Sequence, residues 1–165
     1  MLADGVSQEG AEQIVAEGKN AYSPLKFNSI ASYKNVEFTG TSASGLIQQA
    51  KEEFGGSRPG DSDVVYVLTS KDIEEDGGPA TAGLADCIGG VAFPSRAFAV
   101  GELMDPDRLA IGAVLFSASL SAKVMAHEIA YLLGAHHHYA NCAEGIAGGG
   151  RDGVHRCRPY VTVAA

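Results

Sequence analysis

Apolar residues recur at helical spacing in two segments of the first third of the chain. The first predicted helix runs from Ser7 to Tyr22 and is ended by Pro24. A second helix is predicted after Ser42, with the glycines at 55 and 56 as its stop. The apolar positions that carry these predictions are Ala11, Ile14, Val15, Ala21, Leu46, Ile47, Ala50 and Phe54. Residues 27–38, between the helices, mix aromatic and β-branched residues with polar ones and predict one or two short strands.

The middle of the chain predicts strands. Residues 63–70, with the sequence D-V-V-Y-V-L-T-S, form a nearly continuous β-branched run bounded by turn residues. Such a run is typical of a strand buried on both faces of a sheet, and it predicts the central strand. Residues 83–93 and 97–103 predict two further strands. The acidic, glycine-rich stretch 71–81 predicts an exposed loop.

A third helix is predicted to end at Gly134, with Ser117, Ser119 and Ser121 as candidate N-caps. Its apolar face consists of Met125, Ile129, Leu132 and Leu133. Residues 111–116 are apolar and fit either a strand or a helix, and residues 135–165 predict mostly loop. Helices mixed with strands, without strict alternation, predict a fold of the α/β (α+β) class.

Length and composition restrict the classes of protein and of partner. A chain of 165 residues predicts a single domain, 1–165, and 45% hydrophobic with 19% charged residues is typical of a globular one. The net charge of −8 argues against binding to nucleic acid or anionic membranes, and a neutral or basic polypeptide fits better. No apolar run approaches the roughly 18 to 20 residues of a membrane span, and the N-terminus has no signal pattern.

The chain has three cysteines, Cys87, Cys142 and Cys157. Their spacing matches neither a zinc ribbon nor a redox C-x-x-C pair. One disulfide with one buried thiol and three reduced thiols are therefore both compatible with the sequence, and the pairing stays open.

The candidate chemistry lies in residues 127–137, which read H-E-I-A-Y-L-L-G-A-H-H. Residues four apart on a helix lie on one face about 6 Å apart, so His127 and Tyr131 can converge on one metal ion. Glu128 is placed to take a proton from an attacking water and to pass it to a leaving amine. Gly134 can reverse the chain so that His137 returns as a third ligand.

This spacing, H-E-x-x-(H)-x-x-G-x-x-H with tyrosine at the second ligand, resembles the metzincin metalloproteases. Three further segments resemble, in order, the central strand, the edge-strand region and the active-site helix of the reprolysin or adamalysin branch. They are residues 63–70, 82–90 and 124–128, and the likeness covers roughly residues 10–145.

The resemblance implies a metzincin-like fold, a twisted mixed sheet of about four or five strands packed with long helices. It implies a secreted, extracellular zinc endopeptidase with Glu128 as the catalytic base and His127, Tyr131 and His137 as the zinc ligands. It also implies an extended polypeptide substrate paired with a sheet edge at 81–87. Gly83, Leu84 and Ala85 would lie nearest to that substrate.

Three departures from the family pattern bear on activity. Tyr131 replaces a histidine, and its phenol pKa near 10 must fall by about three units for it to bind zinc as a phenolate at pH 7. Ala130 stands where the family often has glycine. The last methionine is Met125, so the methionine turn expected after His137 is missing. Apart from these three departures, a strand expected before the first helix is missing as well. These gaps predict a catalytic domain that is incomplete at both ends.

Several alternatives remain open at this stage. A pseudoprotease would keep the fold and cleft as a peptide-binding module, with Tyr131 as a plug in the ligand position. Tyrosine could instead have entered an active enzyme by design or by error. His127 and Tyr131 could be plain core residues, and residues 136–138, a histidine triplet, could form a shifted site or an exposed run.

Overall fold

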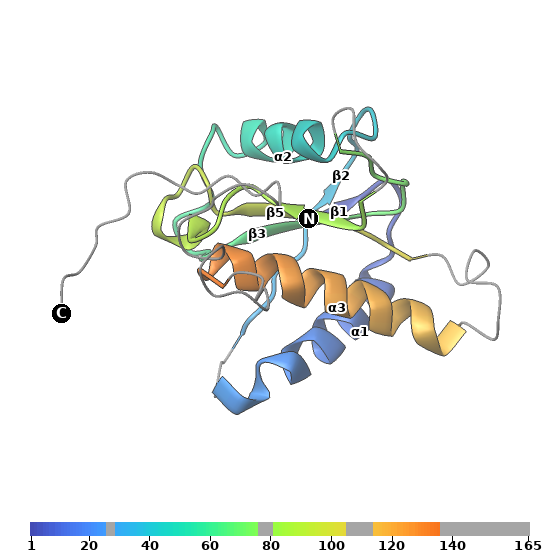
Figure 1. Cartoon of the computed structure of the whole chain (residues 1–165). Helices are drawn as coiled ribbons and strands as arrows, with labels where there is room; N and C mark the ends of the chain where they lie inside the picture. The colour runs from blue at the N-terminus through green and yellow to red at the C-terminus, as the bar shows by residue number, and fades with distance from the viewer. Residues whose placement is uncertain (26–28, 76–80, 105–113, 136–165) are drawn as a thin grey trace, which may run out of the picture.

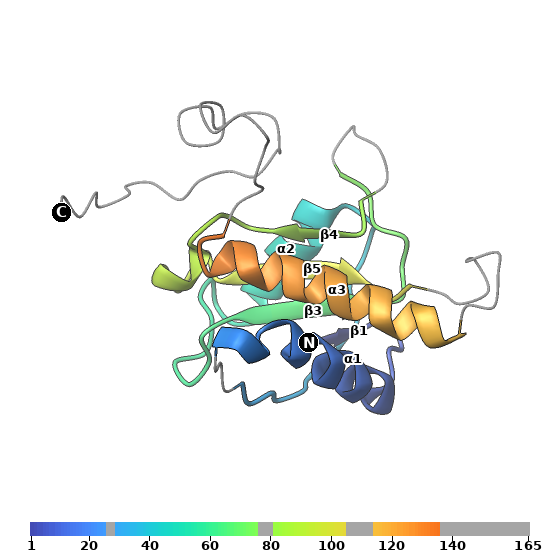
Figure 2. The ribbon, with the colours of Figure 1, turned by 60° about the horizontal axis from the view of Figure 1, so that its bottom comes forward.

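The computed structural model describes residues 1–25, 29–75, 81–104 and 114–135, and only the backbone of residues 114–118. This part of the chain forms three layers, with a five-stranded sheet in the middle (Figure 1). Helix α2 covers one face of the sheet, and α1 and α3 lie side by side on the other (Figures 1 and 2). The predicted α/β class is confirmed. None of the helices within these residues has the length and apolar composition needed to cross a membrane.

The sheet has the strand order β2-β1-β3-β5-β4. Neighbouring strands are parallel except β4, which pairs with β5 in the antiparallel direction and forms one edge. The strands are β1 (Leu2–Ala3), β2 (Asn35–Val36), β3 (Val65–Thr69), β4 (Gly83–Ala85) and β5 (Phe98–Glu102). As predicted, β3 is the central strand. Strand β1 precedes the first helix, so the prediction that this strand is missing is wrong; two residues are too few to give a periodic pattern.

Serine side chains start the first two helices. Helix α1 (Gln8–Ala21) has Ser7 as its N-cap, and α2 (Ala43–Glu52) has Ser42. Each cap oxygen accepts a hydrogen bond from a backbone N–H in the first turn, from Gly10 at 3.1 Å and from Gly45 at 3.2 Å. Both helices therefore begin and end close to the predicted positions.

Helix α3 (Val114–Leu132) starts earlier than predicted. Its candidate caps lie inside the helix, because the helical backbone already begins at Val114 and the modest helix propensity of serine does not interrupt it. Ser121 is buried there, and its hydroxyl accepts a hydrogen bond from the Met104 N–H at 2.9 Å. At the other end, Gly134 has a φ of 102° and terminates the helix as predicted. Leu133 lies just beyond the helix and is exposed rather than part of the apolar face.

Two further predictions are corrected between β3 and β5. The loop after β3 is not wholly exposed, because Ile73 is fully buried in the core under α2. The segment predicted as one strand over 83–93 keeps strand structure only as far as Ala85, and Gly90–Ala92 form a short 3₁₀ helix. Cys87 is buried between them and is disulfide-bonded. The other cysteines lie outside the described residues.

A half-buried ion-pair cluster fixes the end of β4. The Asp86 carboxylate lies 2.9 Å from Lys51 Nζ on α2 and 2.7 Å from Arg96 Nε. We expect Asp86→Ala to lower the free energy of unfolding by about 3 kcal/mol, because both cations lose their partner in a partly desolvated place. Glu53→Ala breaks the exposed Lys34–Glu53 pair and is the matched control, with an expected loss below about 1 kcal/mol. Urea unfolding measures both, and equal losses would contradict the structural role of Asp86.

Candidate active site

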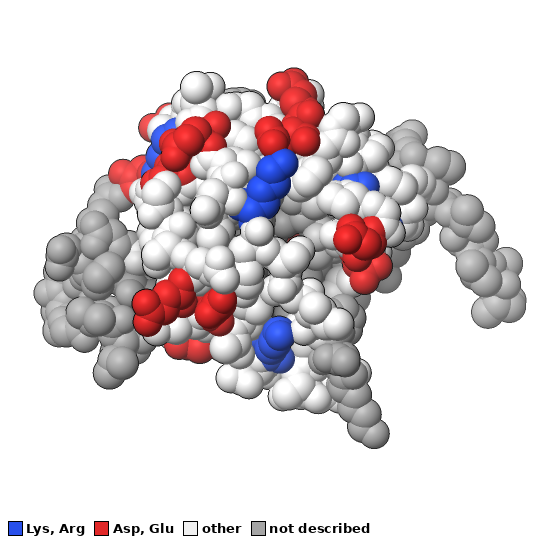
Figure 3. Space-filling model, turned by 180° about the vertical axis from the view of Figure 1, so that it is seen from behind, with Lys and Arg blue, Asp and Glu red and all other residues white. Residues whose placement is uncertain are grey.

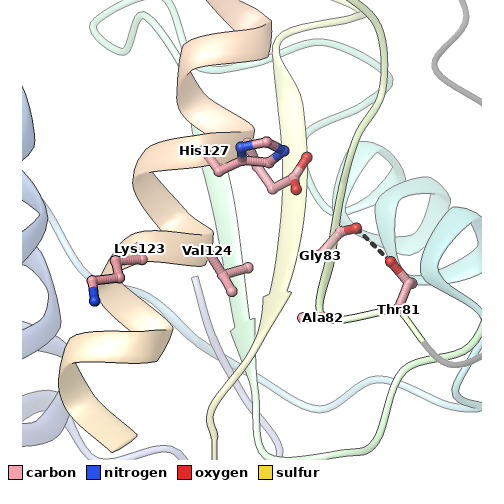
Figure 4. A pocket seen from close by; sticks show the side chains of 7 residues that line it. Thr81, Ala82, Gly83, Lys123, Val124 and His127 are labelled. Carbon is pink, nitrogen blue, oxygen red and sulfur yellow. Dashed lines mark hydrogen bonds between the residues drawn. The ribbon is translucent and has the colours of Figure 1, made fainter. Parts of the chain in front are cut away.

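A pocket lies between helix α3 and edge strand β4 (Figure 4). Its lining combines one face of α3 with the segment that leads into β4: Lys123, Val124, His127, Glu128, Thr81, Ala82 and Gly83. Residues at spacings of three and four share a helix face, which is why these α3 positions reach one pocket. The structure thus brings two residues of the predicted catalytic motif together with one predicted substrate-binding residue.

His127 and Tyr131 lie on adjacent turns of α3, but their side chains have different surroundings. His127 is exposed and lines the pocket. Tyr131 is only 4% exposed and packs in an apolar cluster with Ala85, Ile88, Ala99 and Leu132. The two rings meet edge to face, with centroids 4.6 Å apart and an interplanar angle of 74°. The ring of Tyr131 is therefore a core aromatic that contacts the pocket histidine.

Glu128 is buried at the boundary between the pocket and the sheet edge. It is 6% exposed, and its carboxylate accepts a hydrogen bond from the backbone N–H of Ala85. Burial raises the pKa of Glu128 to about 7, an effect that the Ala85 hydrogen bond partly offsets. A carboxyl group with a pKa near neutrality is suited to both accepting and returning a proton at physiological pH.

The absence of a side chain at Gly83 lets Glu128 reach the strand. A Cβ at this position would lie 2.9 Å from Glu128 Cγ and 2.7 Å from Val124 Cγ1. Both distances are shorter than a Cβ atom tolerates, so glycine is what allows α3 to place the carboxylate against the backbone of β4.

Among the described residues, strand β4 has no neighbouring strand on the side away from β5, and it presents backbone groups to this open side of the sheet. The N–H of Asp86 donates to Phe98 and that of Glu102 donates to Ala82, so the residues between, Gly83 and Ala85, direct theirs away from β5. Side chains already occupy two of these outward groups. Glu128 accepts from the Ala85 N–H, and the Thr81 hydroxyl donates to the Gly83 carbonyl at 2.9 Å (Figure 4). Leu84 faces the opposite way and packs against the core under α2.

The sequence did not single out Tyr66, whose hydroxyl lies beside the backbone of Gly101 and close to Val124 of the pocket wall. Tyr66 belongs to β3, and its ring packs in the two clusters on the α3 side of the sheet. A Cβ at Gly101 of β5 would overlap the Tyr66 hydroxyl, so this glycine provides the space for it. Burial, and then the charge of Glu128, raise the pKa of Tyr66 well above its ordinary value. The signal in the sequence is a single aromatic residue within a strand of β-branched and aliphatic residues.

The donor set fits a zinc ion in part. Imidazole nitrogen is a preferred zinc ligand, and His127 presents one to the pocket. Tyr131 packs in an apolar cluster and offers a phenol oxygen, which is not among the usual zinc ligands. His137, the predicted third ligand, lies outside the described residues. No group of three His, Cys, Asp or Glu side chains converges within residues 1–25, 29–75, 81–104 and 114–135, so a complete site would need ligands from beyond them.

Searches against models of known protein families and against curated proteins find no match for this chain. Its function therefore has to be inferred from the chemistry and the placement of these side chains.

Proposed function

We propose that this chain is a metzincin-like zinc endopeptidase domain that hydrolyses peptide bonds with Glu128 as general base. The placement of Glu128 carries the proposal: a buried carboxyl with a pKa of about 7 lies between a pocket and an open sheet edge. The mixed sheet, with its antiparallel edge strand beside the motif helix, also supports a metzincin-like arrangement.

In this mechanism, His127 and His137 would hold zinc, with Tyr131 as a weak ligand or as a plug in the second ligand position. When bound, zinc would act as a Lewis acid on the scissile carbonyl and make a water acidic enough to lose a proton near pH 7. Glu128 accepts that proton as the water oxygen attacks the carbonyl carbon. It then returns the proton to the amine nitrogen as the carbon–nitrogen bond breaks.

The proposed substrate is an extended polypeptide that adds to the sheet edge at β4, next to Gly83, Leu84 and Ala85. The outward N–H and C=O groups of β4 support this mode, because main-chain hydrogen bonds hold an added strand whatever its sequence. The net charge of −8 favours a neutral or basic polypeptide over nucleic acid or a membrane surface. On the face seen in Figure 3, the described lysines and arginines stand singly among acidic groups, which also disfavours a nucleic-acid surface.

An extracellular location is part of the same proposal. The disulfide at Cys87 supports it, because disulfides persist in oxidising compartments and are rare in the cytosol.

One observation favours a second function, a pseudoprotease that binds peptides without cleaving them. Tyr131 is buried and packs against apolar side chains, and these are the surroundings of a structural residue. In this alternative, the pocket and the edge of β4 bind a polypeptide while the metal is absent or weakly held.

Peptide cleavage with and without a chelator distinguishes the two functions. The purified chain would be assayed for its zinc content and incubated with an unfolded protein substrate, with parallel samples containing EDTA. Cleavage that disappears with EDTA and returns with added zinc is the result expected of the endopeptidase. Binding of the same substrate without cleavage, at full zinc loading, would overturn it in favour of the pseudoprotease.

A further inference from the structure

The hydroxyl of Tyr66 is a buried donor that has no hydrogen-bond partner among the described residues. Such groups are rare in folded proteins, because a buried polar group without a partner loses its hydration and gains nothing in return. Phenylalanine would fill the same space without this cost. The hydroxyl therefore suggests a role in a state of the site other than the one seen here.

Two glycines join Tyr66 to the candidate active site. Gly101 of β5 and Gly83 of β4 are register partners. A Cβ at Gly101 would overlap the Tyr66 hydroxyl and lie 3.2 Å from Val124 Cγ1, and a Cβ at Gly83 would lie 3.1 Å from Glu128 Oε1. The two neighbouring glycines thus leave room that side chains of α3 and β3 fill, with the hydroxyl beside Gly101 and the carboxylate beside Gly83.

Electrostatics agrees with this arrangement. The charge of Glu128 contributes to raising the pKa of Tyr66, after burial, so the two groups lie close enough to interact. The phenol stays protonated at any physiological pH and remains a donor.

The Ala85 N–H, which donates to Glu128, is also a donor that a bound polypeptide would use. The Ala85 N–H points to the open side of β4, where an added strand forms its hydrogen bonds. The carbonyl of such a strand and the Glu128 carboxylate therefore compete for one N–H. A buried carboxylate that loses its hydrogen bond requires another donor.

We propose that Tyr66 is a positioning residue for Glu128. When an extended polypeptide takes the Ala85 N–H, the carboxylate accepts a hydrogen bond from the Tyr66 hydroxyl instead. Both donors then have an acceptor: the Ala85 N–H donates to the peptide carbonyl, and the Tyr66 hydroxyl donates to the Glu128 carboxylate. The catalytic consequence, a general base held in place during attack, rests on the proposed endopeptidase function; the exchange of donors does not.

The first test removes the Ala85 N–H without a substrate. Lactic acid incorporated in place of Ala85 gives an ester that lacks this donor but keeps the methyl side chain. Carbon-13 NMR would then follow the Cζ resonance of Tyr66, which is assigned by its loss in Tyr66→Phe. The expected result is a shift of this resonance in the ester protein that disappears when Glu128→Ala is added. An unchanged resonance in the folded ester protein would overturn the proposal, whether or not the chain cleaves peptides.

The second test separates positioning from packing. Tyr66→Phe is expected to lower kcat by on the order of 10-fold to 100-fold while KM changes by less than about twofold, with no loss of stability. Tyr22→Phe is the matched control, because its hydroxyl donates to the Ala126 carbonyl of the same helix. It should lower stability and leave kcat unchanged. Equal kcat values in wild type and Tyr66→Phe would refute the positioning role. A wild-type chain that cleaves nothing refutes the endopeptidase function, and the NMR result then decides the donor exchange alone.

Discussion

Tyr131→His is expected to raise the affinity of the chain for zinc by on the order of 1,000-fold at pH 7. A tyrosine ligand must first lose a proton with an ordinary pKa near 10, about three units above that pH. A neutral imidazole needs no such ionisation, and one turn after His127 it lies on the same helix face. Competition with a chromogenic chelator measures the affinity.

The same substitution is expected to destabilise the metal-free protein. The smaller imidazole replaces a phenol ring that packs against Ala85, Ile88, Ala99 and Leu132, and we expect a loss of about 1–3 kcal/mol in the presence of EDTA. Zinc should then stabilise Tyr131→His far more than it stabilises the native chain.

Tyr131→Phe is the matched control, since it keeps the ring and removes only the phenol oxygen. A drop in zinc affinity on this change identifies Tyr131 as a ligand, and an unchanged affinity identifies it as a plug. If histidine at this position brings no gain in affinity, position 131 is not a ligand position and the proposed zinc site is wrong.

Glu128→Gln is expected to lower peptide cleavage by on the order of 100-fold to 10,000-fold, the usual contribution of a general base. The amide keeps the shape of the side chain and an oxygen that can accept from the Ala85 N–H. Binding of the substrate should therefore change little while kcat falls. Retained cleavage in this variant would exclude Glu128 as the base.

The same variant is expected to change how the stability of the metal-free protein depends on pH. Burial raises the pKa of Glu128 from 4.5 to about 7, so between these values the folded protein binds more protons than the unfolded chain. Stability therefore falls as the pH rises through this window, by on the order of 3 kcal/mol in total. Glutamine does not titrate, so the stability of Glu128→Gln should not decrease through this window. Glu128→Gln should therefore be more stable than the native chain at pH 8.

Urea unfolding at pH 5 and pH 8, with EDTA present, measures that difference. Glu37→Gln, at an exposed position, is the matched control and should follow the native chain. If Glu128→Gln and the native chain show the same pH dependence of stability, burial does not shift the pKa of the Glu128 carboxyl.

Local sequence features predict where the first two helices lie, which strand is central and which residues are candidates for catalysis. Helix α2 and strand β3 follow from local features, an apolar stripe with a serine cap in one and a β-branched run in the other. The motif spacing also places His127 and Glu128 on one helix, because that spacing is a property of the helix alone.

Predictions from local sequence patterns were wrong in two situations. One is a strand too short to form a pattern, and the other is a residue whose burial depends on long-range contacts. Strand β1 has two residues, and it exists because its backbone pairs with β2 and β3 on both sides. Ile73 lies in a segment of loop composition, yet it is buried because α2 and the sheet leave an apolar space there.

The surroundings of the motif, in contrast, depend on tertiary packing. The sequence allows Tyr131 to face an ion or the core, and packing against Ala85 and Ile88 places its ring in the core. The bond from Ala85 to Glu128 and the position of the Tyr66 hydroxyl depend on two glycines that become neighbours only when β4 pairs with β5. Spacing along a helix fixes which side chains share a face, but burial and hydrogen bonding are set by segments distant in sequence, so they appear only when the sheet and α3 pack together.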